Sequence, residues 1–421
     1  MRALFFICLL FLCDFCCSYR RKEGENGSNT GLDNKMKVVF AWKQMSYDFD
    51  GVIYNNDTDS QSLPNQVQSA AVPNSDKFFI QYNNVPIGLE VYGDRVFVTV
   101  PNRRYGIPST LNYVHLSHTT PSSPSLKPYP SAALSKSSFS TYRPRVDECG
   151  RLWVVDTGVL EQSGDRRQVK SPAVVVYDME TDKEILRREL NSSVLVNERT
   201  SAGLTSIAVE VMDPPYCVDS YAYINDLATE GLVVFSMKSG DSWRVEDPSF
   251  RHEASNFTVA GITLPWKDGL FSISLSGRDR RGRRTAFYHA LVSSQEFSVD
   301  TAALRRGAGG RLLGSRGPNS QSSTHGFHAR TNTLLSASVT QDAITCWNVD
   351  TPLSPENVAV VAQDHEKMVY ISDLKIVDDY VWVLSNQIPT FVYSNELKLF
   401  IFRGKVQDLI KGTVCDRRRR N

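Results

Sequence analysis

A pattern of alternating apolar residues, a polar turn and a second apolar strand recurs six times along the chain. The repeats start at Arg95, Arg151, Tyr221, Gly269, Thr333 and Tyr380, at intervals of 56, 70, 48, 64 and 47 residues. Alternation with a period of two indicates β-strands with one buried face. Long, uneven repeats of β-hairpins are typical of propeller blades, which need about 40–50 residues each. The pattern predicts an all-β fold, a six-bladed β-propeller around a central channel.

A short apolar strand precedes each of these hairpins. These strands start at Ile87, Tyr142, Ser206, Val259, Thr324 and Ile371, and each ends in a polar turn. We assign them as the inner strands of the blades, and we expect a fourth strand in the linker that follows each hairpin. Each unit is then a four-stranded antiparallel blade.

The first residues have the pattern of a secretory signal. Arg2 precedes the apolar run Leu4–Leu12, which is too short to span a bilayer, so residues 1–18 are predicted to be a signal peptide. We expect a flexible polar leader at 19–36, a single propeller domain at 37–416 and a basic tail at 417–421. No later segment is apolar over the ~20 residues of a spanning helix. The sequence therefore predicts a secreted, extracellular protein without a membrane span.

Cysteine and asparagine positions agree with secretion. Four cysteines follow the signal peptide, and an even number in an oxidising compartment suggests two disulfides with three possible connectivities. We favour Cys149–Cys217 and Cys346–Cys415, each closing a loop worth roughly 4 kcal/mol in the chain-entropy model. Four sequons are candidates for glycosylation on surface loops, at Asn26, Asn56, Asn191 and Asn256.

Charge gives little indication of a partner. The formal net charge is +1, so no overall field would attract nucleic acid. Two local arginine runs, Arg278–Arg284 and Arg417–Arg420, could bind a polyanion, and RDRR in the first resembles a protease-processing site. We favour a solvated hairpin tip and a frayed tail for these two runs.

Several long motifs resemble the insect yellow / major royal jelly protein family. They are VPIGLEVYGDRVFVTVPNRRYGIPSTLNYV, RVDECGRLWVVDTG, FTVAGITLPW, CWN at Cys346, DLKIVDDYVWVLSN and the closing GTVCD. The resemblance covers essentially the whole mature chain. It implies a secreted six-bladed propeller, in a family that acts in cuticle pigmentation, reproduction and nutrition. Some salivary members bind biogenic amines in the channel, and a few convert dopachrome.

The chain departs from this family in two places. Many relatives carry an extra cysteine pair flanking the second repeat, and the corresponding stretches contain no cysteine here. This departure supports the pairing of Cys149 with Cys217. The arginine-rich turn of the fourth repeat is also longer than the family's usual turn.

Sequence motifs give no support for hydrolysis or for a bound cofactor. The chain has no GxSxG, HExxH or P-loop, and its four remaining cysteines lie far apart without a CxxC. His325 and His328 are three residues apart, so a strand would place them on opposite faces. We therefore expect no metal and no cofactor.

The channel mouth is the better candidate site. In a propeller, the start of each inner strand and the turn after each second strand lie on one face, near the axis. Acids and amides outnumber bases among the residues that this rule gathers, so an acidic mouth could hold an amine or catechol. Tyr370 or Phe327 could supply a stacking face and a cation–π contact. The candidate ligand-binding residues are Asp156, Asn225, Asp226, Thr324, Gln341, Asp342, Tyr370, Ser372 and Asn386. The opposing interpretation is that an acid in such a turn only caps the backbone.

Three functions remain open. The first is a pigmentation-type protein that binds a small catechol or biogenic amine. The second is a dopachrome isomerase, which needs a general base beside an oxyanion stabiliser; His325 with Asp342, or Asp156 with Arg103, could serve. The third is a structural or signalling role without a small ligand. The sequence leaves the oligomeric state open.

Overall fold

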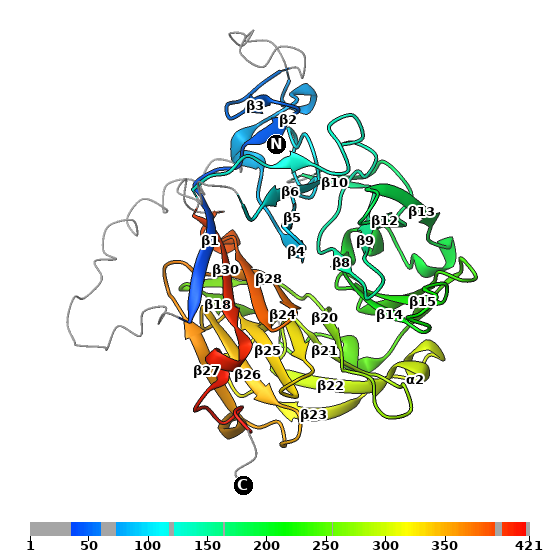
Figure 1. Ribbon diagram of the computed structural model, residues 1–421, viewed down its shortest axis with the longest axis vertical. Helices are drawn as coiled ribbons and strands as arrows, with labels where there is room; N and C mark the ends of the chain where they lie inside the picture. Colours follow the sequence, from blue (N-terminus) through cyan, green and yellow to red (C-terminus); the bar gives the residue numbers. More distant parts are fainter. Residues whose placement is uncertain are drawn as a thin grey trace, which may run out of the picture. The chain divides into compact units, whose positions relative to one another are not determined.

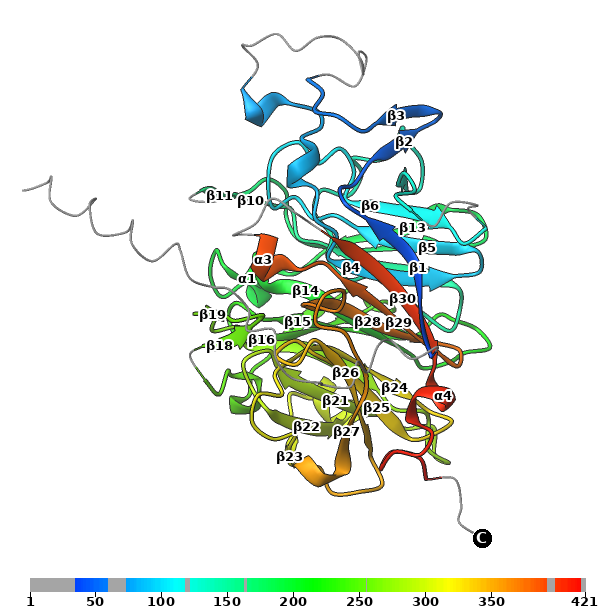
Figure 2. The same ribbon diagram turned by 90° about the vertical axis from the view of Figure 1, so that its left-hand side faces the viewer.

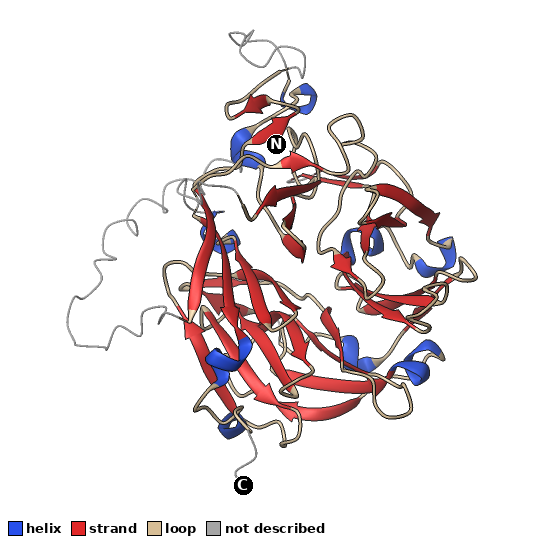
Figure 3. Ribbon diagram, in the orientation of Figure 1, coloured by secondary structure: helices blue, strands red, loops and turns tan. Residues whose placement is uncertain are grey.

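Strands dominate the structure, a computed structural model that describes residues 35–59, 73–117, 122–162, 165–254, 256–391 and 398–417. The predicted signal peptide, the leader up to residue 34, Asn26 and residues 418–421 lie outside the described residues. Six four-stranded antiparallel sheets surround a central axis (Figure 1), and helices are few and short (Figure 3). The predicted six-bladed β-propeller is confirmed.

Blades 1 to 3 follow one another along the chain. Blade 1 contains β4 (Gly88–Tyr92), β5 (Arg95–Thr99), β6 (Leu111–His115) and β7 (Lys127–Pro128). Blade 2 contains β8 (Arg145–Val146), β9 (Arg151–Asp156), β12 (Ala173–Asp178) and β13 (Lys183–Glu189). Blade 3 contains β14 (Leu204–Val211), β15 (Ser220–Asp226), β16 (Gly231–Ser236) and β17 (Ser242–Val245).

Blades 4 to 6 complete the ring. Blade 4 contains β20 (Leu270–Leu275), β21 (Thr285–Ala290), β22 (Gln295–Asp300) and β23 (Arg311–Ser315). Blade 5 contains β24 (Ser322–His328), β25 (Thr333–Ser338), β26 (Ala343–Asn348) and β27 (Val358–Gln363). Blade 6 contains β28 (Ile371–Val377), β29 (Tyr380–Ser385), β30 (Leu399–Lys405) and β1 (Met36–Trp42).

Short elements decorate the blades. Two-stranded hairpins are formed by β2 (Tyr47–Phe49) with β3 (Val52–Tyr54), β10 (Val159–Gln162) with β11 (Asp165–Gln168), and β18 (Phe257–Val259) with β19 (Ile262–Leu264). The α-helices are α1 (Thr200–Gly203), α2 (Thr301–Arg305), α3 (Ile388–Phe391) and α4 (Val406–Ile410). Among the described residues, none of these helices has the length and apolar character needed to cross a membrane.

The alternating pattern is explained by packing between blades. Successive side chains of a strand point to opposite faces of its sheet. On β9, Leu152 and Val154 therefore pack with Phe97 of blade 1, whereas Trp153 packs with Ile207 of blade 3. Each blade is apolar on both faces because it has a neighbour on each side.

The ring is closed by the two ends of the chain. We expected the fourth strand of every blade in the linker that follows it, and this expectation was wrong for blade 6. Its outer strand is β1, from the N-terminal side, which pairs antiparallel with β30 near the C-terminus (Figure 2). The apolar segment that starts the described chain thus covers an edge that would otherwise be unpaired.

The inner strand of blade 4 was also assigned wrongly. The segment that starts at Val259 belongs to the separate hairpin β18–β19, whose turn residues Ala260 and Gly261 both have positive φ. The inner strand is β20, which we had assigned as the second strand, and the arginine-rich segment is the turn between β20 and β21. Two apolar segments of similar length precede that turn, and the pattern alone did not separate them.

Both favoured disulfides are present. Cys149–Cys217 joins the turn after the inner strand of blade 2 to the corresponding turn of blade 3. Cys346–Cys415 attaches the segment after α4 to the third strand of blade 5. Both Cys346 and Cys415 lie in the core with Leu409 and Ile410 of α4, so the end of the domain is held covalently and by apolar packing.

Candidate functional site

A cavity of about 270 Å³ lies where the inner strands begin. Residues at or just before the starts of five inner strands line it: Ile87, Arg143, Thr205, Phe271 and Ser372. Its volume is close to the lower end of the range for small-molecule sites. The cavity is therefore the mouth of the channel, on the face that the sequence predicted.

The charge of this mouth differs from the prediction. Among the described residues that line the cavity, four are arginines, Arg103, Arg143, Arg166 and Arg199, and one is an acid, Asp268. The predicted excess of acids and amides was wrong for this cavity, because the predicted acids have their carboxylates in other places. Positive charge dominates the mouth, which favours anionic ligands.

Arg143 is buried and bridges several blades at the base of the mouth. Its Nε donates to the backbone oxygen of Ser372 at 2.8 Å, and its Nη1 donates to the backbone oxygen of Thr205 at 3.3 Å. The guanidinium lies 4.6 Å from the centroid of the Phe271 ring. Burial lowers the pKa of Arg143, and the nearby Asp373 opposes this shift. Arginine stays charged under such conditions, so a fixed cation stands at the axis.

Aromatic rings form another part of the wall. Tyr370 is buried, and its ring meets Trp266 edge to face with centroids 6.0 Å apart. Burial raises the pKa of Tyr370, so its phenol remains protonated and able to donate a hydrogen bond at neutral pH. With Phe271, these rings give the cavity flat apolar surfaces beside its charges.

Three of the predicted site residues line this cavity: Arg103, Tyr370 and Ser372. The Ser372 hydroxyl donates to the backbone oxygen of Ile87 at 2.9 Å, which ties blade 6 to blade 1. Of these three residues, Tyr370 therefore contributes an aromatic ring to the cavity wall, and Arg103 contributes a positive charge.

Two predicted acids cap backbone instead. Asp156 accepts from the backbone N–H groups of Phe139 at 2.8 Å and Ser140 at 2.9 Å. Asp226 accepts from Arg244 at 2.8 Å and from the amides of its own turn. These contacts match the alternative interpretation that acids in such turns satisfy the backbone.

Most of the other predicted residues also have hydrogen-bond partners within the protein. Asp342 lies 3.0 Å from Nδ1 of His365, and burial raises the pKa of Asp342. Gln341 accepts from Ser338 at 3.2 Å. The amides of Asn225 and Asn386 donate to the backbone oxygens of Leu270 and Pro86, both at 2.9 Å. Thr324 lines a second, inner cavity of the channel.

Neither proposed acid–base pair matches the contacts that the structure gives. His325 has Ser272 and Glu296 as partners, whereas Asp342 has His365. The carboxylate of Asp156 lies 3.6 Å from Arg187, and Arg103 lines the mouth. The isomerase roles of these residues stay predictions without support from the geometry.

Sequence reasoning missed Arg143, Trp266, Asp268 and Phe271. The last three precede or begin β20, so the wrong inner strand in blade 4 concealed them. If β20 had been assigned as the inner strand, selecting residues at the starts of inner strands would have included these three. Arg143 follows the inner-strand start that we assigned at Tyr142, and its contacts with Ser372, Thr205 and Phe271 of other blades show that it points to the axis.

Peripheral features agree with their expected surface positions. Asn56, Asn191 and Asn256 are exposed, and their glycosylation stays a prediction. In the arginine-rich turn, Arg278 pairs with Glu148 of blade 2 at 2.7 Å, and Arg284 contacts the same carboxylate. The turn is thus held at its two ends.

Comparison with known proteins places the chain in a family. A sequence profile described as "Major royal jelly protein" matches residues 139–415. The chain is 36% identical over 417 residues to "L-dopachrome tautomerase yellow-f" of Drosophila melanogaster, covering 90% of this chain and 94% of that protein. It is 32% identical over 407 residues to "Protein yellow" of Drosophila yakuba and 33% to that of Drosophila erecta, covering 91% of this chain and 71% of each relative. The family predicted from the motifs is confirmed, and with it a link to pigmentation: the chain belongs to the yellow / major royal jelly protein family.

Proposed function

We propose that this chain is a secreted protein that binds a small anionic aromatic molecule at the channel mouth and tautomerises L-dopachrome there. One observation carries the proposal: four arginines and one aspartate surround a cavity walled by Phe271, Tyr370 and Trp266. L-dopachrome is an indoline quinone with a carboxylate, so it offers a flat ring and a negative charge. The relative named a dopachrome tautomerase, 36% identical over nearly its whole length, supports this choice.

Electrostatics favours this ligand over a biogenic amine. Two unit charges 6 Å apart interact by about 3 kcal/mol at an effective dielectric constant of 20. Arg103, Arg166 and Arg199 are exposed, so solvent weakens their contribution, whereas Arg143 is buried and keeps most of it. Among the described lining residues, Asp268 is the only one whose charge would attract an ammonium group. A carboxylate is attracted by the whole set.

The cavity also offers groups for proton transfer. Tautomerisation to a dihydroxyindole moves two protons: each leaves a saturated ring carbon, its electron pair shifts into the ring, and a quinone oxygen is protonated. Asp268 is the only acid among the described residues that line the mouth, so it is the candidate base. The Tyr370 phenol and the Arg143 guanidinium are donors that could stabilise the developing oxyanion.

Asp268→Asn tests the proposed base. The decay of L-dopachrome absorbance, corrected for spontaneous decay, should accelerate with the wild-type protein. We expect Asp268→Asn to lose about 10²–10⁴-fold in rate while still binding an unreactive indole-2-carboxylate. Glu198→Gln is the matched control, because Glu198 is an exposed acid next to the mouth residue Arg199 and does not line the cavity. Unchanged turnover in Asp268→Asn would exclude this base.

A competition experiment separates the three candidate functions. Calorimetric titration with dopamine, serotonin and indole-2-carboxylate should show binding of the carboxylate alone. Tight amine binding that Asp268→Asn abolishes would favour the amine-binding function. If no ligand binds and dopachrome decay is unchanged, a structural or signalling role remains. Sequencing the N-terminus of the protein recovered from culture medium tests secretion and the cleavage near Ser18.

A further inference from the structure

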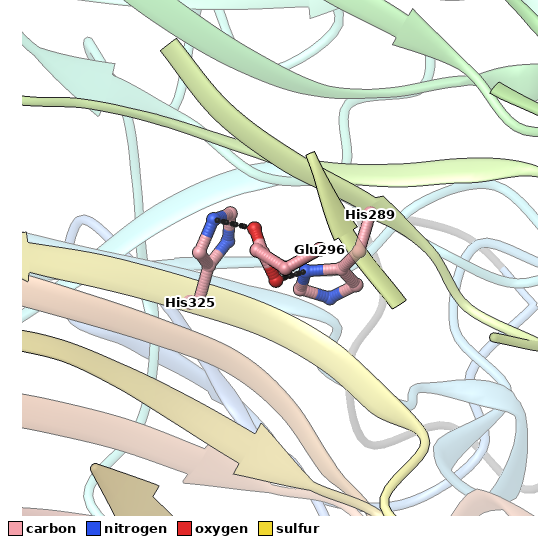
Figure 4. Close-up of side chains that lie close together, drawn as sticks. All are labelled: His289, Glu296 and His325. Carbon is pink, nitrogen blue, oxygen red and sulfur yellow. Dashed lines mark hydrogen bonds and ion pairs between the residues drawn. The ribbon is translucent and has the colours of Figure 1, made fainter. Parts of the chain in front are cut away.

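A second group of buried polar side chains lies between blades 4 and 5. His289 on β21, Glu296 on β22 and His325 on β24 are 0%, 2% and 5% exposed, respectively. The atoms that they turn toward one another all lie within 4.8 Å (Figure 4). Burying three ionisable groups together is costly unless they are paired or coordinate an ion.

Each histidine has its outer nitrogen beside an oxygen. Nε2 of His289 lies 3.1 Å from the backbone oxygen of Ser322, which can only accept, so this nitrogen carries the hydrogen. Nδ1 of His325 lies 2.5 Å from Oγ of Ser272, an oxygen that also accepts the backbone N–H of His325. Metal-binding histidines are commonly oriented in this way, with the second nitrogen donating to an oxygen.

The inner nitrogens both face the carboxylate of Glu296. Nδ1 of His289 lies 3.0 Å from Oε2, and Nε2 of His325 lies 3.2 Å from Oε1. Nε2 of His325 and Oε1 of Glu296 have no hydrogen-bond partner among the described residues. With its hydrogen on Nε2, His289 directs a lone pair at a carboxylate oxygen. Such a contact is repulsive unless either a second proton on His289 or a metal cation lies between these atoms.

The spacing matches the requirement of a small divalent ion. Nitrogen and oxygen ligands about 2.0–2.2 Å from a tetrahedral zinc ion lie roughly 3.3 Å apart, close to the 3.2 Å between Nε2 of His325 and Oε1 of Glu296. One ligand atom from each of the three residues lies within 4.8 Å of the other two. Imidazole and carboxylate ligands suit zinc and neighbouring transition metals.

The positive charge of Arg316 opposes the binding of a metal ion at this site. It is buried, and its Nη1 lies 2.6 Å from Oε2 of Glu296, so it already neutralises part of the carboxylate. This contact fixes the carboxylate and leaves Oε1 for an ion, but it weakens the attraction for a second positive charge. Affinity would depend mainly on the two imidazoles.

We propose that His289, Glu296 and His325 form a binding site for one divalent transition metal ion of the zinc class. Ser272 and His325 also line the inner cavity of the channel, about 80 Å³ in volume. This cavity has room for water, which could supply a fourth ligand. Three protein ligands with an open position are the arrangement of a zinc site that is accessible to a small molecule.

The test uses the full secreted chain, treated with a chelator and dialysed. Titration with Zn²⁺ should show one site, and Co²⁺ should give the visible absorption of a low-coordinate ion bound to nitrogen. His325→Ala and Glu296→Gln should each weaken Zn²⁺ binding by at least about 100-fold. His328→Ala is the matched control: His328 is buried on the same strand, but its partners are Thr331 and Asp379.

Two results would overturn the proposal. One is a chelator-treated wild-type protein that binds neither Zn²⁺ nor Co²⁺ and whose Tm does not rise with added Zn²⁺. The other is a folded His325→Ala protein that binds Zn²⁺ as the wild type does, which would assign the binding to surface histidines. Because the wild-type Tm measurement needs no variant, the proposal can be refuted even if the substituted proteins fail to fold.

Discussion

Replacing Arg143 with methionine should destabilise the propeller and also weaken the binding of an anionic ligand at the channel mouth. Methionine keeps the apolar stem of the side chain and removes the guanidinium. The bonds to the backbone oxygens of Ser372 and Thr205 are lost, and so is the cation over Phe271. Hydrogen bonds from a charged donor are worth about 1.5–3 kcal/mol, and a desolvated cation–π contact about 2. Allowing for the long second bond, we expect a loss of about 3–5 kcal/mol.

Thermal unfolding at pH 7 measures this loss. For a domain of this size, 4 kcal/mol corresponds to a fall of about 5 °C in Tm. Arg143→Lys is the control, because lysine keeps the charge but cannot bridge two backbone oxygens in a fork; its loss should be intermediate. The titration with indole-2-carboxylate should weaken in Arg143→Met and less in Arg143→Lys. A loss below about 1 kcal/mol in Arg143→Met, or a lysine variant as stable as the wild type, would refute the bridging role.

Three further predictions concern other parts of the fold. Burial raises the pKa of Asp342, so this carboxyl binds a proton more tightly in the folded protein than in the unfolded chain. The folded protein therefore loses stability as the pH rises through the raised pKa. Asp342→Asn should raise Tm at pH 7 and leave it unchanged near pH 3. Replacing Cys346 and Cys415 together by serine opens a loop with a sequence separation of 69 residues and should cost about 4 kcal/mol in a urea titration, and an unchanged midpoint would argue against that contribution. Brief trypsin treatment of the native protein should make its first cut within the propeller at Arg280 or Arg281, exposed between the two anchored ends of the arginine-rich turn. A first cut at another site between β1 and β30 would contradict this ordering.

The blade repeat could be predicted because one physical cause produces it. Every blade has a neighbour on both faces, so successive side chains of a strand pack against different blades. On β9, Leu152 packs against blade 1 and Trp153 against blade 3. The inner strand of blade 4 was not predictable in the same way, since β19 and β20 are both short and apolar. Choosing between them required the pairing of β20 with β21, a contact across a nine-residue turn with no local signal.

The site was harder to predict than the fold. Sequence position placed Tyr370 and Ser372 at the mouth, because both lie at an inner-strand start. It did not show whether an acid points to the channel or to backbone N–H groups: Asp156 accepts from Phe139 and Ser140 in the preceding segment, and Asp226 accepts from its own turn. The direction of a single side chain depends on its hydrogen-bond partners, which come from other blades or from the turn itself.

The pairing of β1 with β30 has a consequence for biosynthesis. A ribosome releases Met36–Trp42 more than 350 residues before Leu399–Lys405, the partner strand. During all of that synthesis, the first strand is an apolar segment whose partner does not yet exist, and the ring cannot close before Leu399–Lys405 has been made. Pairings at such sequence separation are slow and leave the intermediate open to aggregation. Maturation of this protein is therefore expected to be post-translational and dependent on chaperones that shield the waiting strand.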